Sequence, residues 1–253
     1  MRSSITASST LRLLTYNIQA GARNWTEYLR SGLPSKRERR PGYRNLEKIA
    51  AVLTGYDLVG LQEVDTGSFR TAYVDQVAYL AKKAGFPNWC SQTNRTLGRW
   101  SKHGNGVLTR LQPAEQVTHK LPGVPGRGAI FLRFGSGENQ LIVIVVHLAL
   151  GNVSRTKQLN MIQALIANHK HVIIMGDMNC SPNRLVILKR LGLVPVSSRL
   201  PTFPSWQPLR SLDQVWISPT IQLNNVDALA YELSDHLPVA VEITLPFELD
   251  ILS

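Results

Sequence analysis

The sequence has little cysteine, no long apolar stretch and no excess of acidic residues, and each absence excludes a class of protein. Two cysteines, Cys90 and Cys180, are too few for a disulfide framework, so we expect a reducing compartment and a cytoplasmic location. The longest apolar run, Leu141 to Val146, has the length of a strand, and a transmembrane helix would need roughly 18 residues. Residues 1–10 are rich in Ser and Thr without an apolar core, which predicts a flexible N-terminus rather than a secretory signal.

Positive charge is the unusual bulk property of the sequence. The formal net charge is +11, and the excess lies in residues 1–130, which carry 19 Lys or Arg and 8 Asp or Glu. Such a field attracts nucleic acid or an anionic membrane surface, to which the protein would bind peripherally, although a basic face can also serve solubility alone. The basic residues concentrate in two clusters: Arg23, Arg30, Lys36, Arg37, Arg39, Arg40, Arg44 and Lys48, followed by Arg95, Arg99 and Lys102.

Short apolar runs rich in strand-forming residues outnumber the helical patterns. Several of these runs follow one another without a helix between them, which favours an α/β (α+β) fold of two packed mixed sheets flanked by helices over one doubly wound sheet. We find no repeat and no low-complexity linker, so residues 11–253 are expected to form one domain. We also expect a monomer. The predicted strands are 11–18, 57–62, 106–111, 130–134, 140–147, 172–175, 214–218 and 239–244, and the predicted helices are 43–53, 71–84 and 154–168.

Residues able to bind a metal or transfer a proton stand at the ends of these apolar runs. They are Asn17, Glu63, His147, Asp177, Asn179, Asp213, Asp235 and His236. Each one alone has an ordinary explanation, since Asn17 can be a turn residue, Glu63 a helix cap and His147 a satisfied core histidine. Buried carboxylates are costly, however, unless they are paired or bind a cation, and oxygen-rich ligation suits Mg²⁺ or Mn²⁺. The whole set therefore indicates a divalent-metal site, and the lack of a Cys/His cluster argues against structural zinc.

Seven motifs resemble those of the endonuclease/exonuclease/phosphatase superfamily, in that family's order and over about residues 11–245. The most specific are Gly-Asp-Met-Asn-Cys-Ser-Pro at 176–182 and Ser-Asp-His-Leu-Pro at 234–238. The others are Thr-Tyr-Asn-Ile-Gln (15–19), Leu-Gln-Glu-Val-Asp (61–65), His-Gly-Asn-Gly-Val-Leu-Thr-Arg (103–110), Val-His-Leu (146–148) and Leu-Asp-Gln-Val-Trp-Ile (212–217). Finer features, such as Arg155 with Gln158 and Thr-Phe-Pro at 202–204, resemble uncharacterised bacterial members of the YbhP-like group. The resemblance implies a four-layer α/β/β/α sandwich and a Mg²⁺-dependent phosphoesterase.

The resemblance also implies a metal site. Glu63 would be the main Mg²⁺ ligand, Asn17 would lie beside the metal and the scissile phosphate, and Asp235 would hold the metal directly or through water. One position departs from the pattern of the abasic-site nucleases in this superfamily, which carry an Asp two residues after the Asn. Here that position is Gln19, which weakens the expectation of a second cation and of a DNA-repair activity.

Catalytic roles follow from the same motifs. Asp177 would position and deprotonate the attacking water, and Asn179 would hold a phosphate oxygen. His236, oriented by Asp213, would contact the phosphoryl group, and His147 would stabilise charge on that group or on the leaving oxygen. The motifs leave open whether Asp177 or the pair of His236 and Asp213 is the general base. The substrate-binding candidates are His103, Asn105 and Arg155.

The substrate class stays open at this stage. A phosphodiester in nucleic acid and one in a phospholipid headgroup are equally compatible with the basic first half, and the superfamily also includes sphingomyelinases and inositol-phosphate phosphatases. Trp89 and Trp100 interleave with basic residues, and such rings can stack on bases, lie in a lipid interface or pack in a core. The alternative to an enzyme is a non-catalytic anion-binding module on the same scaffold, which would require the catalytic set to have decayed.

Overall fold

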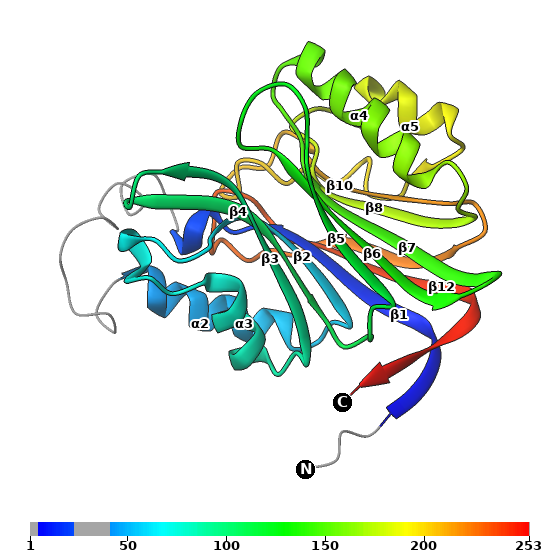
Figure 1. Ribbon diagram of the computed structural model, residues 1–253, viewed down its shortest axis with the longest axis horizontal. Helices are drawn as coiled ribbons and strands as arrows, with labels where there is room; N and C mark the ends of the chain where they lie inside the picture. The colour runs from blue at the N-terminus through cyan, green and yellow to red at the C-terminus, as the bar shows by residue number, and fades with distance from the viewer. Residues whose placement is uncertain (1–4, 23–40, 253) are drawn as a thin grey trace.

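The strands form two six-stranded mixed sheets that pack face to face in the computed structural model, which describes residues 5–22 and 41–252 (Figure 1). In spatial order, the first sheet contains β11 (Gln222–Ala228), β12 (Val239–Leu252), β1 (Ile5–Asn17), β2 (Leu58–Asp65), β4 (Ser101–Thr109) and β3 (Asn88–Leu97). The second contains β5 (Glu115–Lys120), β6 (Gly128–Ser136), β7 (Asn139–His147), β8 (His171–Asp177), β10 (Asp213–Ile217) and β9 (Val194–Pro195).

Helices cover the outer face of each sheet. On the first sheet lie α2 (Pro41–Leu53) and α3 (Gln76–Ala84), whose apolar stripes pack on the outward residues of β1, β2 and β4. On the second lie α4 (Asn152–Ile166) and the short α5 (Val186–Arg190), which pack on the outward residues of β7, β8 and β10. The predicted four-layer α/β/β/α sandwich is therefore confirmed.

The central core lies between the two sheets and depends on alternation along each strand. In β7, Val143 and Val145 face the first sheet, whereas Ile142, Ile144 and Val146 face the helical layer. Both faces are buried, which is why this segment reads in the sequence as a continuous apolar run.

The N-terminal prediction needs correction. β1 begins at Ile5, and residues 5–8 pair with residues 249–252 at the C-terminal end of β12. The described part of the predicted flexible N-terminus, residues 5–10, is therefore a paired strand. This extension lies at the rim of the sheet, where a strand does not need two apolar faces. It therefore lacks the apolar pattern by which a strand is predicted, and its residues are mostly Ser and Thr.

Strand pairing brings the polar strand ends to one edge of the sandwich. β1 and β2 run parallel with Asn17 opposite Gln62, and β7 and β8 run parallel with His147 opposite Asp177. β10 runs antiparallel to β8, so that its first residue, Asp213, lies opposite Asp177. The carboxyl ends of the parallel strands thus meet where the loop before β12 returns with Asp235 and His236.

Position 176, next to this edge, requires glycine because of its backbone conformation and the backbone that lies close to it. It has φ +143°, and a Cβ atom there would lie 1.9 Å from the carbonyl oxygen of Val146. We expect Gly176→Ala to lower the free energy of unfolding by about 2–4 kcal/mol, because the new methyl group meets backbone that cannot move aside. Urea denaturation measures this, with Gly55→Ala as the control, since Gly55 has open space around it. Equal losses in the two variants would contradict the steric argument.

Candidate active site

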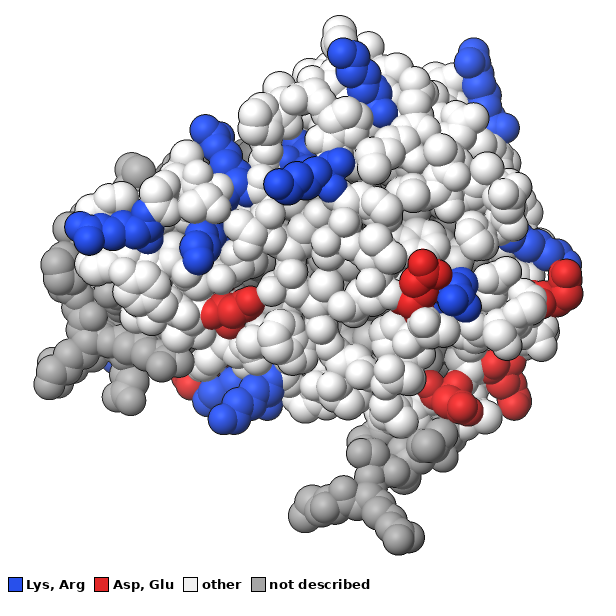
Figure 2. Space-filling model, viewed as in Figure 1, with Lys and Arg blue, Asp and Glu red and all other residues white. Residues whose placement is uncertain are grey.

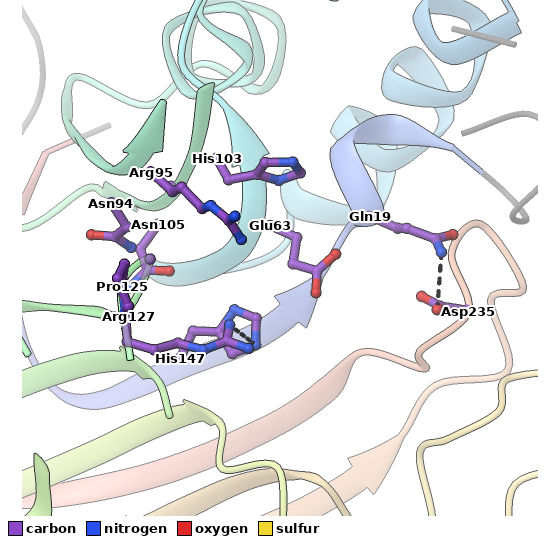
Figure 3. Close-up of a pocket in the computed structure, with 12 residues that line it drawn as sticks. Gln19, Glu63, Asn94, Arg95, His103, Asn105, Pro125, Arg127, His147 and Asp235 are labelled. Carbon is purple, nitrogen blue, oxygen red and sulfur yellow. Dashed lines mark hydrogen bonds between the residues drawn. The ribbon is translucent and has the colours of Figure 1, made fainter. Parts of the chain in front are cut away.

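A cleft of about 270 Å³ opens at this edge of the sandwich (Figure 3). Of the predicted site residues, Glu63, His103, Asn105, His147 and Asp235 line it. Asn17, Asp177, Asn179, Asp213 and His236 do not line the cleft but join the same network of side-chain contacts. The remaining lining residues are Gln19, Asn94, Arg95, Gly104, Pro125, Gly126 and Arg127.

Glu63 enters the cleft from a β-bulge. The pairing of β2 with β4 shifts register between Gln62 and Val64, and Glu63 itself has φ +54°. A non-glycine residue in this conformation stores roughly 1–3 kcal/mol of strain, which functional sites often carry. Desolvation raises the pKa of the Glu63 carboxyl above its ordinary value, although the nearby His236 opposes this. The fold therefore holds a carboxylate where it lacks water, and a cation would offset that cost.

Asp177 is the centre of a buried hydrogen-bond network. Its Oδ2 atom accepts from Asn17 Nδ2 at 3.2 Å, and its Oδ1 atom accepts from the backbone N–H of Asn179 at 2.8 Å. Asn179 has φ +53° and donates its own Nδ2 to the carbonyl oxygen of Leu148 at 2.9 Å. Burial raises the pKa of Asp177 to about 7, even though His236 lowers it. This carboxyl can therefore both lose and accept a proton near neutral pH.

His236 and Asp213 form a buried ion pair. His236 Nδ1 donates to Asp213 Oδ2 at 2.7 Å, and Thr202 Oγ1 donates to the same oxygen at 2.5 Å. Burial alone would lower the pKa of His236, but the Asp213 carboxylate outweighs it and raises the pKa to about 10. Phe203 lies against the imidazole with ring centroids 4.8 Å apart. The Thr-Phe-Pro segment thus holds both members of the pair, a role that sequence reasoning did not assign to it.

His147 lies between Asp177 and an arginine. Its Nε2 atom is 3.5 Å from Asp177 Oδ2 and accepts from Arg127 Nη1 at 2.6 Å. Burial, and then the charge of Arg127, lowers the pKa of His147 well below its ordinary value. His147 is therefore neutral at pH 7, and the cation beside it is Arg127.

Gln19 and Asp235 lie next to each other on the side of the cleft opposite Arg127 (Figure 3). Gln19 Nε2 donates to Asp235 Oδ2 at 3.0 Å, while Gln19 Oε1 is buried and has no hydrogen-bond partner among the described residues. Ser234 Oγ donates to Asp235 Oδ1 at 3.2 Å, and burial raises the pKa of Asp235. Gln19 thus orients Asp235 and also carries an unused oxygen ligand.

The predicted substrate-binding residues divide into two groups. His103 and Asn105 line the cleft, where Asn105 Nδ2 donates to the carbonyl oxygen of Gly128 and desolvation lowers the pKa of His103 to about 4. Arg155 does not reach the cleft. It is buried in α4, and its Nη1 donates to the carbonyl oxygens of Ala149 and Leu150 at 3.0 and 2.8 Å. The structure therefore makes Arg155 a residue that positions the loop after His147.

Arg95 and Arg127 are cleft residues that sequence reasoning missed as part of the site. Arg95 was noted only as a member of a basic cluster, and Arg127 was not singled out. No motif marks either one, because a lone arginine in a chain with 28 basic residues carries no distinguishing pattern. The only signal was the pair of glycines flanking Arg127, which indicates backbone that approaches other groups closely.

Basic side chains outnumber acidic ones over the upper part of the face in Figure 2, whereas acidic side chains gather towards its lower right. Within the described residues, Arg44 and Lys48 of the first predicted cluster and Arg95 and Arg99 of the second are exposed. The other members of the first cluster, Arg23, Arg30, Lys36, Arg37, Arg39 and Arg40, lie outside the described residues. In residues 5–22 and 41–252, no helix is long and apolar enough to cross a membrane.

The model of the endonuclease/exonuclease/phosphatase family matches residues 14–236. The chain belongs to this family. The match confirms the resemblance of the motifs to this family. No curated protein sequence matches the chain.

Solved structures of the family share the fold at low sequence identity. An endonuclease/exonuclease/phosphatase from Beutenbergia cavernae is 21% identical, with a TM-score of 0.71 over 93% of this chain and 72% of that one. A mannosyl-6-phosphatase from Bacteroides thetaiotaomicron is 14% identical, with a TM-score of 0.72 over 93% and 100%. The catalytic domain of human Nocturnin, with a bound sulfate, is 17% identical, with a TM-score of 0.69 over 96% and 97%.

Proposed function

We propose that this protein is a divalent-metal-dependent phosphoesterase that cleaves a phosphodiester by attack of an activated water. The observation that carries the proposal is the buried cluster of Asp177, Asp213 and His236, whose side-chain N and O atoms lie within 4.8 Å of one another beside the cleft that Glu63 lines. An anionic phosphodiester repels nucleophiles, so its hydrolysis requires charge stabilisation and an aligned water. A non-catalytic anion-binding module would not need residues that transfer protons, such as Asp177 and His236.

The donor set fits Mg²⁺ or Mn²⁺. Glu63 and Asp235 are carboxylates whose pKa values are raised by burial, and Gln19 Oε1 is a buried oxygen without a partner among the described residues. We assign the ion to Glu63, with Asn17 adjacent and Asp235 as a further ligand, because hard cations prefer oxygen. Bound there, the cation supplies positive charge to the phosphoryl oxygens.

A second grouping could in principle hold an ion. The ligand atoms of Asp177, Asp213 and His236 lie within 4.8 Å of one another. Asp213 Oδ1 is buried without a hydrogen-bond partner among the described residues, as Gln19 Oε1 is. We still do not assign the metal to this grouping, because Asp213 Oδ2 already accepts two hydrogen bonds and His236 Nδ1 donates to Asp213. That arrangement suits an acid–base pair better than a cage for a hard cation.

Asp177 is the general base in this proposal. Its Oδ2 atom lies next to both Asn17 and His147, and a carboxyl with a pKa of about 7 accepts a proton from water efficiently near neutral pH. His236, with a pKa of about 10, is already protonated, so it donates to a phosphoryl oxygen through Nε2 instead of removing a proton. The contacts of Asp177 and the directions of the two pKa shifts together support Asp177 over the pair of His236 and Asp213 as the base.

Substrate class and cellular setting are further parts of the proposal. The basic first half supports an anionic partner, either nucleic acid or the surface of an anionic membrane. We also propose that the protein is a monomer and cytoplasmic.

A hydrolysis panel with Mg²⁺ tests the function on plasmid DNA, RNA, lysophospholipids, sphingomyelin and inositol phosphates. Hydrolysis of at least one class is expected, and inactivity of the folded protein on all of them would contradict the proposal.

Asp213→Asn tests the role of His236. Removing the carboxylate charge removes the stabilisation of the imidazolium, so the pKa of His236 should fall. Turnover at pH 7 should drop by about 10²–10⁴-fold, as expected when an orienting carboxylate is lost. Proton NMR of the imidazole across a pH series measures the pKa shift. Thr202→Val is the control, because it removes a hydrogen bond to Asp213 and keeps the charge. An unchanged His236 pKa in Asp213→Asn would reject the ion pair.

Gln19→Asp tests the number of metal ions. The wild-type protein should bind close to one Mg²⁺ in a calorimetric titration, because Gln19 is neutral. The new carboxylate would lose the hydrogen bond to Asp235 and place two negative charges side by side. We therefore expect tighter binding or a weak additional site, with a modest effect on rate. Two tight, independent sites in the wild-type protein would show that Gln19 does not limit the metal count.

A further inference from the structure

The cleft has two sides of opposite charge (Figure 3). Glu63 and Asp235 provide carboxylates towards Gln19, whereas the other side carries the guanidinium groups of Arg95 and Arg127. No Asp or Glu stands on the arginine side among the residues that line the cleft. Carboxylates suited to a cation therefore lie next to guanidinium groups suited to an anion, and the proposed reaction assigns no role to these guanidinium groups.

Arg95 lines the cleft with an exposed side chain. In the part of the chain that the structure describes, it forms no ion pair. Its aliphatic stem lies along the turn that precedes Arg127, because a Cβ atom on Gly126 would be 3.3 Å from both Cβ and Cδ of Arg95. Gly126 has φ +92°, so glycine serves both the turn and this close approach. The guanidinium therefore points into the cleft with its charge unused (Figure 3).

Arg127 connects this side of the cleft to the catalytic network. Its Nη1 atom donates to His147 Nε2 at 2.6 Å, and His147 in turn lies 3.5 Å from Asp177. Arg127 thus contacts His147, which the motifs assign to the phosphoryl group or the leaving oxygen, and Arg95 lines the same side of the cleft (Figure 3). If one part of the substrate binds between the two guanidiniums, that part must lie close to the reacting phosphate in the substrate's own covalent structure.

We propose that Arg95 and Arg127 form a second anion subsite, which binds a phosphate other than the scissile one. The preferred substrates would then carry at least two phosphate groups, an inference that rests on the proposed phosphoesterase function. Two adjacent guanidiniums offer a planar, multidentate set of donors that matches phosphate oxygens. Asn94, which also lines this side, adds an amide beside them.

The second phosphate could come from two sources with the same chemistry. In a nucleic-acid strand it is the neighbouring backbone or terminal phosphate, and in a small phosphorylated compound it is a second ester on the same ring. Two pairs of ligands separate these sources: the dinucleotide dTpdT with and without a 5′-phosphate, and inositol 1,4-bisphosphate against inositol 1-phosphate.

The test measures equilibrium affinity by calorimetry in EDTA, where no turnover is expected. In the wild-type protein, the member of a pair that carries the additional phosphate should bind about tenfold or more tightly, as charged hydrogen bonds imply. Arg95→Gln should reduce this ratio to within about twofold. Arg99→Gln is the matched control, because Arg99 is on the same hairpin but stacks on Trp100 and does not line the cleft. It should keep the wild-type ratio.

Each outcome bears on the subsite separately from catalysis. The pair that shows the ratio identifies the source of the phosphate. Equal affinities within both pairs, no detectable binding, or a ratio that survives Arg95→Gln would overturn the subsite. Turnover of the same compounds with Mg²⁺ is measured in parallel. An affinity ratio without turnover would reject the proposed function but support the subsite. Turnover without an affinity ratio would support the proposed function but reject the subsite.

Discussion

Asp177→Asn is expected to lower kcat for phosphodiester hydrolysis by about 10²–10⁴-fold, which is the usual contribution of a positioned general base. The carboxamide is the same size and can still accept from Asn17 or from the backbone of Asn179, but it cannot take a proton from water. Metal affinity should stay close to that of the wild-type protein, since Glu63 and Asp235 are unchanged. Steady-state kinetics and a calorimetric Mg²⁺ titration of the same preparation measure both quantities.

Although Asp177→Asn should lower the rate, it should not lower the free energy of unfolding above neutral pH. Burial raises the pKa of Asp177 to about 7, above the value near 4 of an unfolded aspartate. Its ionisation therefore opposes folding, and the wild-type protein should lose stability as the pH rises from about 4 through about 7. The variant lacks this loss, so it should unfold at an equal or higher urea concentration at pH 8. Asp227→Asn, an exposed change on β11, is the control and should alter neither rate nor stability. A wild-type rate in Asp177→Asn would reject this carboxylate as the base.

Glu63→Gln is expected to remove the response of the enzyme to Mg²⁺. The substitution keeps the shape of the side chain but deletes the carboxylate that the bulge in β2 directs into the cleft. Turnover should fall by about 10³-fold or more at millimolar Mg²⁺, because the charge stabilisation supplied by the metal is lost. Higher Mg²⁺ concentrations should recover part of the rate if Asp235 and Asn17 still attract the ion.

The control for this variant is Glu47→Gln, which neutralises an exposed glutamate of α2 that pairs with Lys83. Surface ion pairs of this kind contribute little, so its kinetics should match those of the wild-type protein. Circular dichroism tests whether Glu63→Gln folds, which we expect because the strained φ of residue 63 is a backbone property and the buried charge is removed. Unaltered Mg²⁺ dependence in Glu63→Gln would show that the metal binds elsewhere.

The sequence predicted the central strands because they are buried on both faces and read as continuous apolar runs. The edge strands β3, β5 and β11 were missed, since most of their residues are exposed and they carry no such run. The helix expected from residue 71 begins only at Gln76. Ala72 and Tyr73 adopt positive φ, and Asp75 caps the helix by accepting from the N–H groups of Val77 and Ala78.

The location of the proposed acid–base residues was predictable because motifs mark them and strand ends place them at one edge of the sandwich. What the sequence could not provide was the state of each group. Neither the protonated state of His236 nor the neutral state of His147 follows from a motif, since both depend on a neighbour from a distant part of the chain. The contacts of Arg155 were unpredictable for the same reason, because its partners are backbone carbonyls that only the folded loop presents.

The most direct test of the central claim is the initial rate of bis(4-nitrophenyl) phosphate hydrolysis by one preparation, measured before chelation, in excess EDTA and after return of Mg²⁺ or Mn²⁺. We predict hydrolysis at the start, a rate indistinguishable from that of buffer in EDTA, and recovery with the metal in the wild-type protein but not in Asp177→Asn. Full activity in EDTA, or an equal rate in Asp177→Asn, would contradict a metal-dependent phosphoesterase built on this cleft.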